Sequence, residues 1–273
     1  MLLPLQLSAF TAFMPRFAAN LSMLFTEHSF LDRFAAARAA GFDAVEFLFP
    51  YEYEPDEIAR RLEENGLRLV LHNLPPGDWD RGDRGNACDP RRMGEFRAAA
   101  HTAVRYATRL NVPHVHCMAG IVPRGLDPRR AREAYIVNLQ YAADLFAPHG
   151  IGVLIEPING HDMPDYFLQG STQALDIIAA ADRPNLFLQY DIYHMHRMGE
   201  PVAQTLRASL PSIRHIQIAD APGRHEPGTG EIDYPGLFSL LDETGYEGWV
   251  GCEYRPRDAT LAGLGWRDVV QMR

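Results

Sequence analysis

Four oxygen-bearing side chains stand where four short apolar runs of the sequence end. They are Glu156 after GVLI, Asp191 in LFLQYD, Gln217 in IRHIQ and Glu253 in WVGCE. In a parallel α/β protein the carboxyl ends of the strands face a common site, so these side chains are expected to converge. Three of them are carboxylates, which repel each other strongly when they are brought together in a partly dry site.

A bound cation would remove this repulsion between the carboxylates. An all-oxygen donor set suits Mg²⁺ or Mn²⁺ better than a structural Zn²⁺. The sequence therefore predicts one divalent-metal site, and the alternative is a hydrogen-bonded acid cluster without a metal.

Two further side chains follow the same apolar runs. His194 comes three residues after Asp191, in DIYHMH, and could be a metal ligand, a substrate donor or a packed loop histidine. Of these roles we favour substrate contact. Arg224 lies in the loop after residues 214–220, where a guanidinium could pair a substrate carboxylate in bidentate fashion. The alternative for Arg224 is a solvated loop arginine.

Three other histidines lie in or at the ends of apolar runs. His72 and His116 end two earlier runs, and each could either line a pocket or make a structural hydrogen bond. His215 precedes Gln217 by two positions, so it shares a face with it but lies deeper, and core packing is its better interpretation.

The rest of the chain alternates short apolar runs with helical patterns, which are the elements that must position these side chains. Strands are predicted at 17–22, 44–49, 68–73, 114–120, 152–156, 186–191, 214–220 and 249–254. Helices are predicted at 29–41, 55–66, 91–110, 128–148, 171–182, 200–209 and 235–244, with a weak helical tail after the last strand.

Eight strand–helix units in about 260 residues are the count of a (β/α)8 TIM barrel. A doubly wound sheet more often has a glycine-rich turn after its first strand, and NLSMLFTEH offers none. We therefore predict a single α/β domain over residues 14–273. Residues 1–13 are predicted to be a disordered or non-native extension, the alternative being an arm that packs on the protein.

The composition excludes several classes of chemistry. All 26 basic residues are arginine, so Schiff-base chemistry, lysine-anchored pyridoxal phosphate and P-loop nucleotide binding have no lysine to use. The net charge of −9 gives the chain no overall attraction for nucleic acid or anionic membrane.

The sequence also favours a cytoplasmic protein that acts on a small molecule. Its three cysteines are odd in number and widely spaced, which fits a reducing compartment. The apolar start, MLLPLQLSAFTAF, has no basic residue before Arg16 and is too short and interrupted to span a membrane. We expect no nucleic-acid or membrane partner, and the sequence leaves a homo-oligomer open.

Several runs resemble the hydroxypyruvate isomerase family, of the xylose-isomerase-like barrel superfamily. They are IEPIN, QYDIYH, HIQIADAPGRHEPGTGEIDY and GWVGCEY, and LHNLPPGDW and GFDAVEFLFPY extend the resemblance to residues 15–256. The resemblance implies that Glu156, Asp191, Gln217 and Glu253 are metal ligands. It also implies that Glu156 and Glu253 are the acid/base pair, and His194 and Arg224 match substrate-contacting positions of related ketose epimerases. Many of those relatives carry histidine where this chain has Gln217.

The implied reaction is the metal-assisted isomerisation of hydroxypyruvate to tartronate semialdehyde (2-hydroxy-3-oxopropanoate) through an enediolate. One glutamate removes a carbon-bound proton and the other returns one to the neighbouring carbon. We provisionally assign Glu253 as the abstracting base and Glu156 as the returning acid.

Other functions use a similar barrel. Isomerisation of a 2-oxotetronate or 3-epimerisation of a ketose would use the same site, and the loop residues that could choose among substrates are Phe49, Tyr51, Trp79 and Met118. A DNA-repair enzyme like endonuclease IV is a remote alternative, because it needs a histidine-rich multi-zinc site and a basic face. A non-catalytic barrel that binds a sugar acid is a further alternative.

Overall fold

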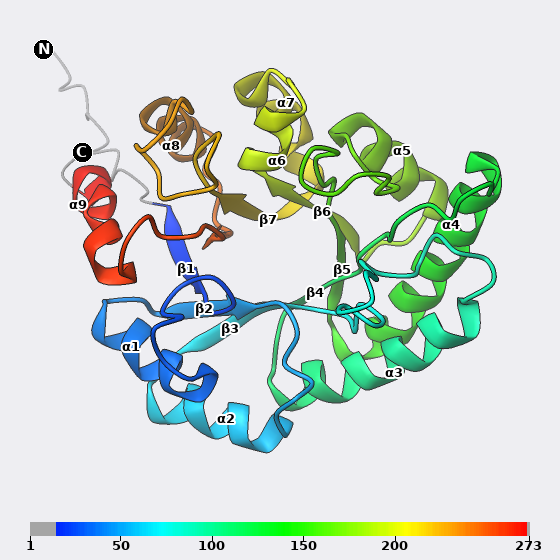
Figure 1. Ribbon diagram of the computed structural model, residues 1–273, viewed down its shortest axis with the longest axis horizontal. Coiled ribbons are helices and arrows are strands. Elements are labelled where there is room, and N and C mark those ends of the chain that lie inside the picture. The colour runs from blue at the N-terminus through cyan, green and yellow to red at the C-terminus, as the bar shows by residue number, and fades with distance from the viewer. Residues whose placement is uncertain (1–14, 272–273) are drawn as a thin grey trace, which may run out of the picture.

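Eight parallel strands close into one barrel, with helices around its outside (Figure 1). The computed structural model describes residues 15–271. Each strand is hydrogen-bonded to the next in chain order, and β8 pairs with β1 to complete the barrel. The strands are β1 (Arg16–Asn20), β2 (Ala44–Phe47), β3 (Arg68–Asn73), β4 (His114–His116), β5 (Gly152–Ile155), β6 (Leu186–Asp191), β7 (Ile213–Ile218) and β8 (Trp249–Cys252). The single-domain TIM barrel predicted from the sequence is confirmed.

The helices follow the strands in alternation. They are α1 (Arg33–Ala39), α2 (Pro55–Glu64), α3 (Met93–Arg109), α4 (Pro128–Phe146), α5 (Ser171–Ala181), α6 (Ile192–Arg197), α7 (Val202–Ser209), α8 (Tyr234–Glu243) and α9 (Trp266–Gln271), with short 3-10 turns between some of them. Two begin in ways that the sequence signals directly. Pro55 opens α2, and Asp127 caps α4 by accepting a hydrogen bond from the Arg129 backbone N–H.

Helix α6 was not predicted from the sequence. The next helix was expected at 200–209, and the structure has α6 directly after β6. Asp191, at the end of β6, accepts a hydrogen bond from the Tyr193 N–H at 2.8 Å and a longer one from the His194 N–H at 3.4 Å. This cap starts the helix without any connecting residue. The fourth strand is also shorter than predicted, since it ends at His116.

The barrel interior is layered, because alternate residues of a strand share one face. One buried cluster consists of Ala18, Ala44, Val70, Leu71 and Leu154, with Phe187 and Trp249 packed against it. Two positions further along their strands or just beyond them, the same faces carry buried polar side chains: Asn20 after Ala18, Glu46 after Ala44 and Glu156 after Leu154. The polar layer thus lies on an apolar floor, towards the carboxyl ends of the strands.

The predicted extension at residues 1–13 lies outside the described residues. Among residues 15–271, the longest helices are too polar or too short to cross a membrane.

Candidate active site

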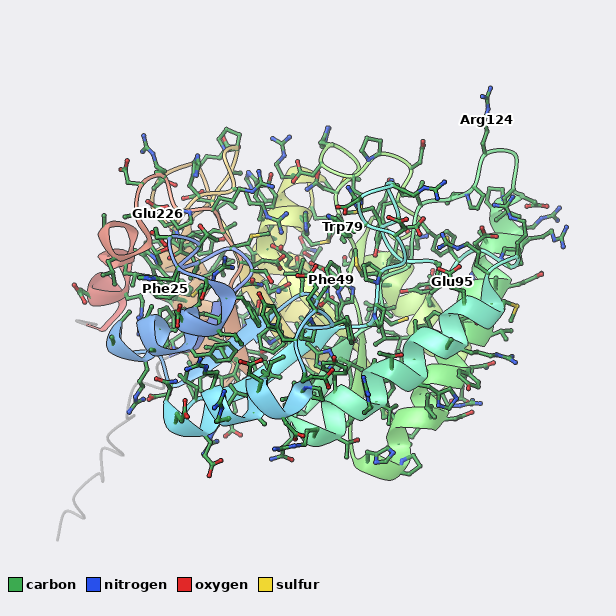
Figure 2. All side chains as sticks on the ribbon, turned by 60° about the horizontal axis from the view of Figure 1, so that its bottom comes forward. Phe25, Phe49, Trp79, Glu95, Arg124 and Glu226 are labelled. Atoms are coloured by element: carbon green, nitrogen blue, oxygen red, sulfur yellow. The ribbon has the colours of Figure 1, made fainter. Side chains whose placement is uncertain are left out.

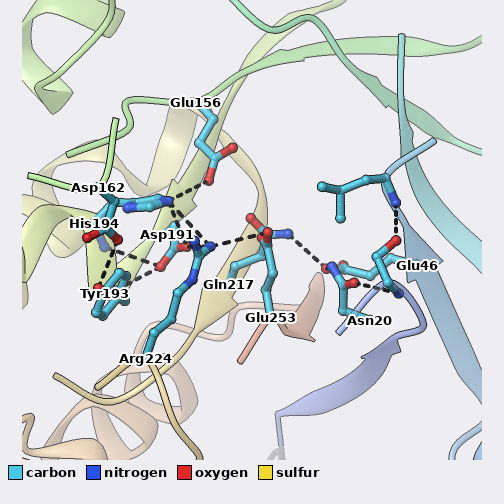
Figure 3. Close-up of polar contacts among 12 residues, drawn as sticks. Asn20, Glu46, Glu156, Asp162, Asp191, Tyr193, His194, Gln217, Arg224 and Glu253 are labelled. Atoms are coloured by element: carbon cyan, nitrogen blue, oxygen red, sulfur yellow. Dashed lines mark hydrogen bonds and ion pairs between the residues drawn. The ribbon is translucent and has the colours of Figure 1, made fainter. Parts of the chain in front are cut away.

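Two carboxylates and a histidine lie together at the carboxyl end of the barrel (Figure 3). Glu156 directly follows β5, Asp191 ends β6 and His194 lies in α6. The Nε2 atom of His194 is 3.6 Å from Asp191 Oδ2 and 3.9 Å from Glu156 Oε1. One ligand atom from each residue lies within 4.8 Å of the others. This spacing is compatible with one divalent cation.

The donor atoms themselves also fit a cation. Glu156 Oε1 and Asp191 Oδ2 are buried, and in the described part of the chain neither has a hydrogen-bond partner. Burial, together with the neighbouring charges of Glu253 and Asp191, raises the pKa of Glu156 well above its usual range. Burial likewise raises the pKa of Asp191 to about 6 and that of Glu253 to about 8. A divalent cation would supply the positive charge that balances these carboxylates in their ionised form.

Arg224 approaches the same carboxylates from the loop after β7. Its Nη2 lies 3.2 Å from Glu253 Oε1 and 3.6 Å from Asp191 Oδ2, and its guanidinium lies over the Tyr193 ring at 5.2 Å. Only 17% of its side chain is exposed. The predicted partner of Arg224 was a substrate carboxylate, whereas in the structure its partners are carboxylates of the protein.

Gln217 lies in β7, beside Asp191 of the neighbouring strand β6. Its amide is held on both sides, because Nε2 donates to Glu46 at 2.8 Å and Oε1 accepts from Gln189 at 2.6 Å. The carbonyl oxygen keeps one further lone pair that could serve a cation. The structure therefore brings all four predicted ligands to one end of the barrel, and the amide of Gln217 has a protein partner on each side.

Glu46 is also part of the site, as a strand-end residue to which the sequence assigned no specific role. Its carboxylate is almost fully buried and accepts from Asn20 at 2.9 Å and Gln217 at 2.8 Å, and its second oxygen lies 2.6 Å from His215 Nε2. Gly251 makes room for it, because a Cβ there would lie 2.3 Å from Glu46 Oε2. The available signal was a glutamate inside an otherwise apolar strand.

The hydrogen bonds around His194 assign its proton. Asn159 Oδ1 accepts from the backbone N–H groups of His161 and Asp162, at 3.1 and 2.8 Å. Its Nδ2 therefore points to His194 Nδ1, 2.6 Å away. Nδ1 thus accepts a hydrogen bond, which leaves the proton on Nε2, whose neighbours are Asp191 Oδ2 at 3.6 Å and Arg224 Nη2 at 3.5 Å. In this tautomer Nε2 is a hydrogen-bond donor, and a cation at this atom would require the proton to lie on Nδ1 instead.

The other two predicted histidines lie in different places. His116 Nδ1 is 3.6 Å from Glu156 Oε2, and burial lowers the pKa of His116 to about 3, so the ring is neutral. His72 is not among the residues that line the cavity. Its Nδ1 lies 3.1 Å from the Asn73 carbonyl oxygen, and burial lowers its pKa to about 4. The structure therefore does not bring His72 to the cluster.

The cluster opens into a cavity of about 510 Å³. Glu156, Glu253, His116, His194 and Arg224 line it. Of the four loop residues considered for substrate choice, Trp79 and Met118 also line it, and Phe49 and Tyr51 do not. The cavity volume is in the usual range for a small-molecule site.

Comparison with known proteins gives a consistent result. Residues 34–269 match the model of the xylose isomerase-like TIM barrel family. The chain is 51% identical to the 2-oxo-tetronate isomerase of Cupriavidus necator, over 93% of this chain and 97% of that protein. It is 48% identical to the hydroxypyruvate isomerase of Escherichia coli, over 93% of this chain and 99% of that protein.

A solved structure is also close to this one. The crystal structure of AP endonuclease, family 2, from Brucella melitensis superposes with a TM-score of 0.92 at 47% identity. The match covers 94% of this chain and 99% of that chain. The fold and chain length are therefore shared almost completely.

Proposed function

The chain belongs to the hydroxypyruvate isomerase and 2-oxo-tetronate isomerase family of xylose isomerase-like barrels, and from that premise we propose that it isomerises 2-oxo-tetronate, a four-carbon 2-oxo sugar acid. The protein is an isomerase of this type. The observation that carries the proposal is a pair of buried glutamates, Glu156 and Glu253, that line one cavity and whose pKa values are raised by burial. Hydroxypyruvate, which the sequence alone favoured, becomes the second candidate.

The two candidate substrates react at the same two carbons. In each, a proton leaves C3, one is delivered to C2, and the carbonyl and hydroxyl groups exchange places through an enediol. 2-Oxo-tetronate differs from hydroxypyruvate by one hydroxymethyl group on C3. The relative with 51% identity is named for the four-carbon acid, and the relative with 48% identity for the three-carbon acid. The names therefore favour the four-carbon substrate.

We assign a divalent cation, Mg²⁺ or Mn²⁺, to Glu156, Asp191, Gln217 and Glu253. When bound, the cation polarises the substrate's carbonyl and hydroxyl oxygens and makes the C3 proton more acidic. The choice of ion rests on the donor set, in which all four ligands offer oxygen. The unpartnered oxygens of Glu156 and Asp191 support the assignment.

The protein's own groups carry the proton transfers. Glu253 takes the proton from C3 and Glu156 gives one to C2, while the hydroxyl proton passes from the C3 oxygen to the C2 oxygen. The sum of these steps leaves the enzyme with the same number of protons. A carboxyl group whose pKa is near the working pH can serve as either acid or base. The pKa of Glu253 is raised to about 8 by burial. His194, with its proton on Nε2, donates to a substrate oxygen as the charge on that oxygen grows.

DNA repair is the rival suggested by the name of the Brucella melitensis structure. The net charge of −9 and the carboxylate-rich cluster argue against a phosphate-binding face. Salt-dependent binding to abasic DNA would favour this rival.

A substrate panel tests the proposal. Initial rates are measured with 2-oxo-tetronate, hydroxypyruvate and a free ketose, each with Mg²⁺, with Mn²⁺ and with EDTA. We expect the highest kcat/KM for 2-oxo-tetronate and no turnover in EDTA. A higher kcat/KM for hydroxypyruvate would favour the second candidate, and preference for the uncharged ketose would contradict the proposal of a sugar acid.

A further inference from the structure

We propose that Arg84, stacked on Trp79, binds the carboxylate of the substrate and selects sugar acids over uncharged ketoses. The inference rests on the proposed function, because it names the group that recognises the acid at the same site. Arg84 lines the cavity that contains Glu156 and Glu253. It lies in the loop between β3 and α3, whereas the residues of the proposed metal cluster lie in or directly after β5 to β8.

The guanidinium of Arg84 is held in place by two kinds of contact. Its Cζ atom lies 3.8 Å from the centroid of the Trp79 ring. Its Nη1 atom donates to two backbone carbonyls, those of Trp79 at 3.0 Å and Asp83 at 2.7 Å. Trp79 is itself packed against Phe49, with ring centroids 5.1 Å apart, and Figure 2 shows the two residues next to each other. The side chain is therefore oriented before any ligand binds.

The edge of the Arg84 guanidinium formed by Nε and Nη2 is free to bind a ligand. Within residues 15–271, no acceptor is recorded for Nε or Nη2 of Arg84, and no carboxylate forms an ion pair with it. Asp83, its neighbour in sequence, instead binds Arg92 through two hydrogen bonds, at 2.8 and 2.6 Å. The Nε and Nη2 donors form a parallel pair that matches the two oxygens of a carboxylate.

Two other arginines line the cavity and are weaker candidates for this role. Arg224 is already paired with Glu253 and Asp191. With a dication in place, its charge completes the neutralisation of the three ligand carboxylates, so it leaves no charge for a substrate anion. Arg255 is exposed, and no hydrogen bond or ion pair is recorded for its side chain in the described chain, so nothing orients it. Arg84 is the cavity cation that is both oriented and unpaired.

The test compares binding of an acid with that of its uncharged counterpart. The probes are L-threonate, a four-carbon hydroxy acid without the reactive ketone, and threitol, in which a hydroxymethyl group replaces the carboxylate. Their Kd values are measured by ligand-observed NMR on the full chain, in EDTA and with Mg²⁺. The variants are Arg84→Met and Arg84→Lys, and the matched control is Arg81→Met. Arg81 is a strongly exposed arginine of the same loop that lies 4.0 Å from Asp78.

We expect Arg84→Met to weaken threonate binding at least about tenfold and to leave threitol binding unchanged, since a charge-assisted pair is lost. Arg84→Lys should retain part of the affinity for threonate, because it keeps the charge without the planar pair of donors. Arg81→Met should bind both probes like the wild type. If Arg84→Met folds poorly, Arg84→Lys and the ratio of the two Kd values still test the proposal.

Three results would overturn it. Threonate binding could be unaffected by Arg84→Met, threonate and threitol could weaken equally, or Arg255→Met could reproduce the whole loss. The proposed function fails separately, when the wild-type protein does not turn over 2-oxo-tetronate or hydroxypyruvate. If the wild type is active and the Arg84→Met variant keeps the same KM, the role of Arg84 is rejected and the proposed function stands.

Discussion

The buried carboxyl groups predict that the metal-free protein becomes less stable as pH rises through the neutral range. Burial raises the pKa of Glu253 to about 8 and that of Glu156 well above its usual value of 4.5. Unfolded glutamates are fully ionised near neutrality, so the folded state binds more protons than the unfolded state. Stability must then fall with increasing pH until the folded-state pKa is passed.

The pH range in which this loss of stability can be assigned to the two glutamates is from about pH 7 to about pH 8. Buried histidines act in the opposite direction below this window, because burial lowers the pKa of His72 and His114 to about 4. Their effect fades above about pH 6.5, the pKa of unfolded histidine, where less than half of the unfolded imidazole keeps its proton. Asp191, with a pKa of about 6, has also finished titrating. One proton contributes about 1.4 kcal/mol per pH unit, so Glu253 gives roughly 1 kcal/mol across the window, and Glu156 adds to the same trend.

Urea unfolding in EDTA at several pH values measures this slope. Glu253→Gln should remove about 1 kcal/mol of it, the share of one partly protonated glutamate. Glu63→Gln, at an exposed position of α2, is the matched control and should keep the wild-type slope. Saturating Mg²⁺ should reverse the trend, because the cation binds the ionised carboxylates. A flat wild-type profile in EDTA, or equal slopes for wild type and Glu253→Gln, would refute the reasoning.

Four variants test the site. Glu156→Gln and Glu253→Gln should each lower kcat by about 10²- to 10⁴-fold with little change in melting temperature, because an amide cannot exchange the proton. Gly251→Ala should destabilise the protein by about 1 to 3 kcal/mol in urea, because its methyl group would meet the Glu46 carboxylate. Asn159→Asp should move the proton of His194 from Nε2 to Nδ1, because a carboxylate accepts a hydrogen bond where the amide donates one. The ¹⁵N chemical shifts of the ring report this change.

For each of these variants, one result would contradict the prediction. Near-normal turnover of either glutamine variant would reject that residue as acid or base. Wild-type stability of Gly251→Ala would mean that the Glu46 carboxylate has space to move. An unchanged histidine ¹⁵N spectrum in Asn159→Asp would mean that another group sets the proton's position.

The sequence was sufficient to predict the barrel and the convergence of the strand-end acids. Strand periodicity places Glu156, Asp191 and Glu253 at strand ends, and the fold then brings those ends together. Helix α6 was missed because its six residues follow β6 with no break, and because Asp191 was considered as a ligand and not as a cap. Local pattern does not separate those two roles, and the Asp191 carboxylate that caps the helix is also the one proposed as a ligand.

Contacts across the barrel could not be predicted from local pattern. Glu46 meets Gln217 and His215 only after β2 and β7 face each other across the closed sheet. The stacking of Arg84 on Trp79 likewise depends on the conformation of a long loop, for which the sequence has no periodicity. These interactions are set by tertiary packing, so the candidate site was predicted only for residues at the ends of strands.

The polar layer beneath the cluster also affects how the chain folds. Glu46 is separated from His215 by 169 positions and from Gln217 by 171, so these bonds close very long loops. Such contacts form slowly and late. A nascent chain that has emerged only through β6 holds Glu46 with Asn20 as its one partner from this layer. We therefore expect the catalytic end of the barrel to be completed only when the last quarter of the chain has been synthesised.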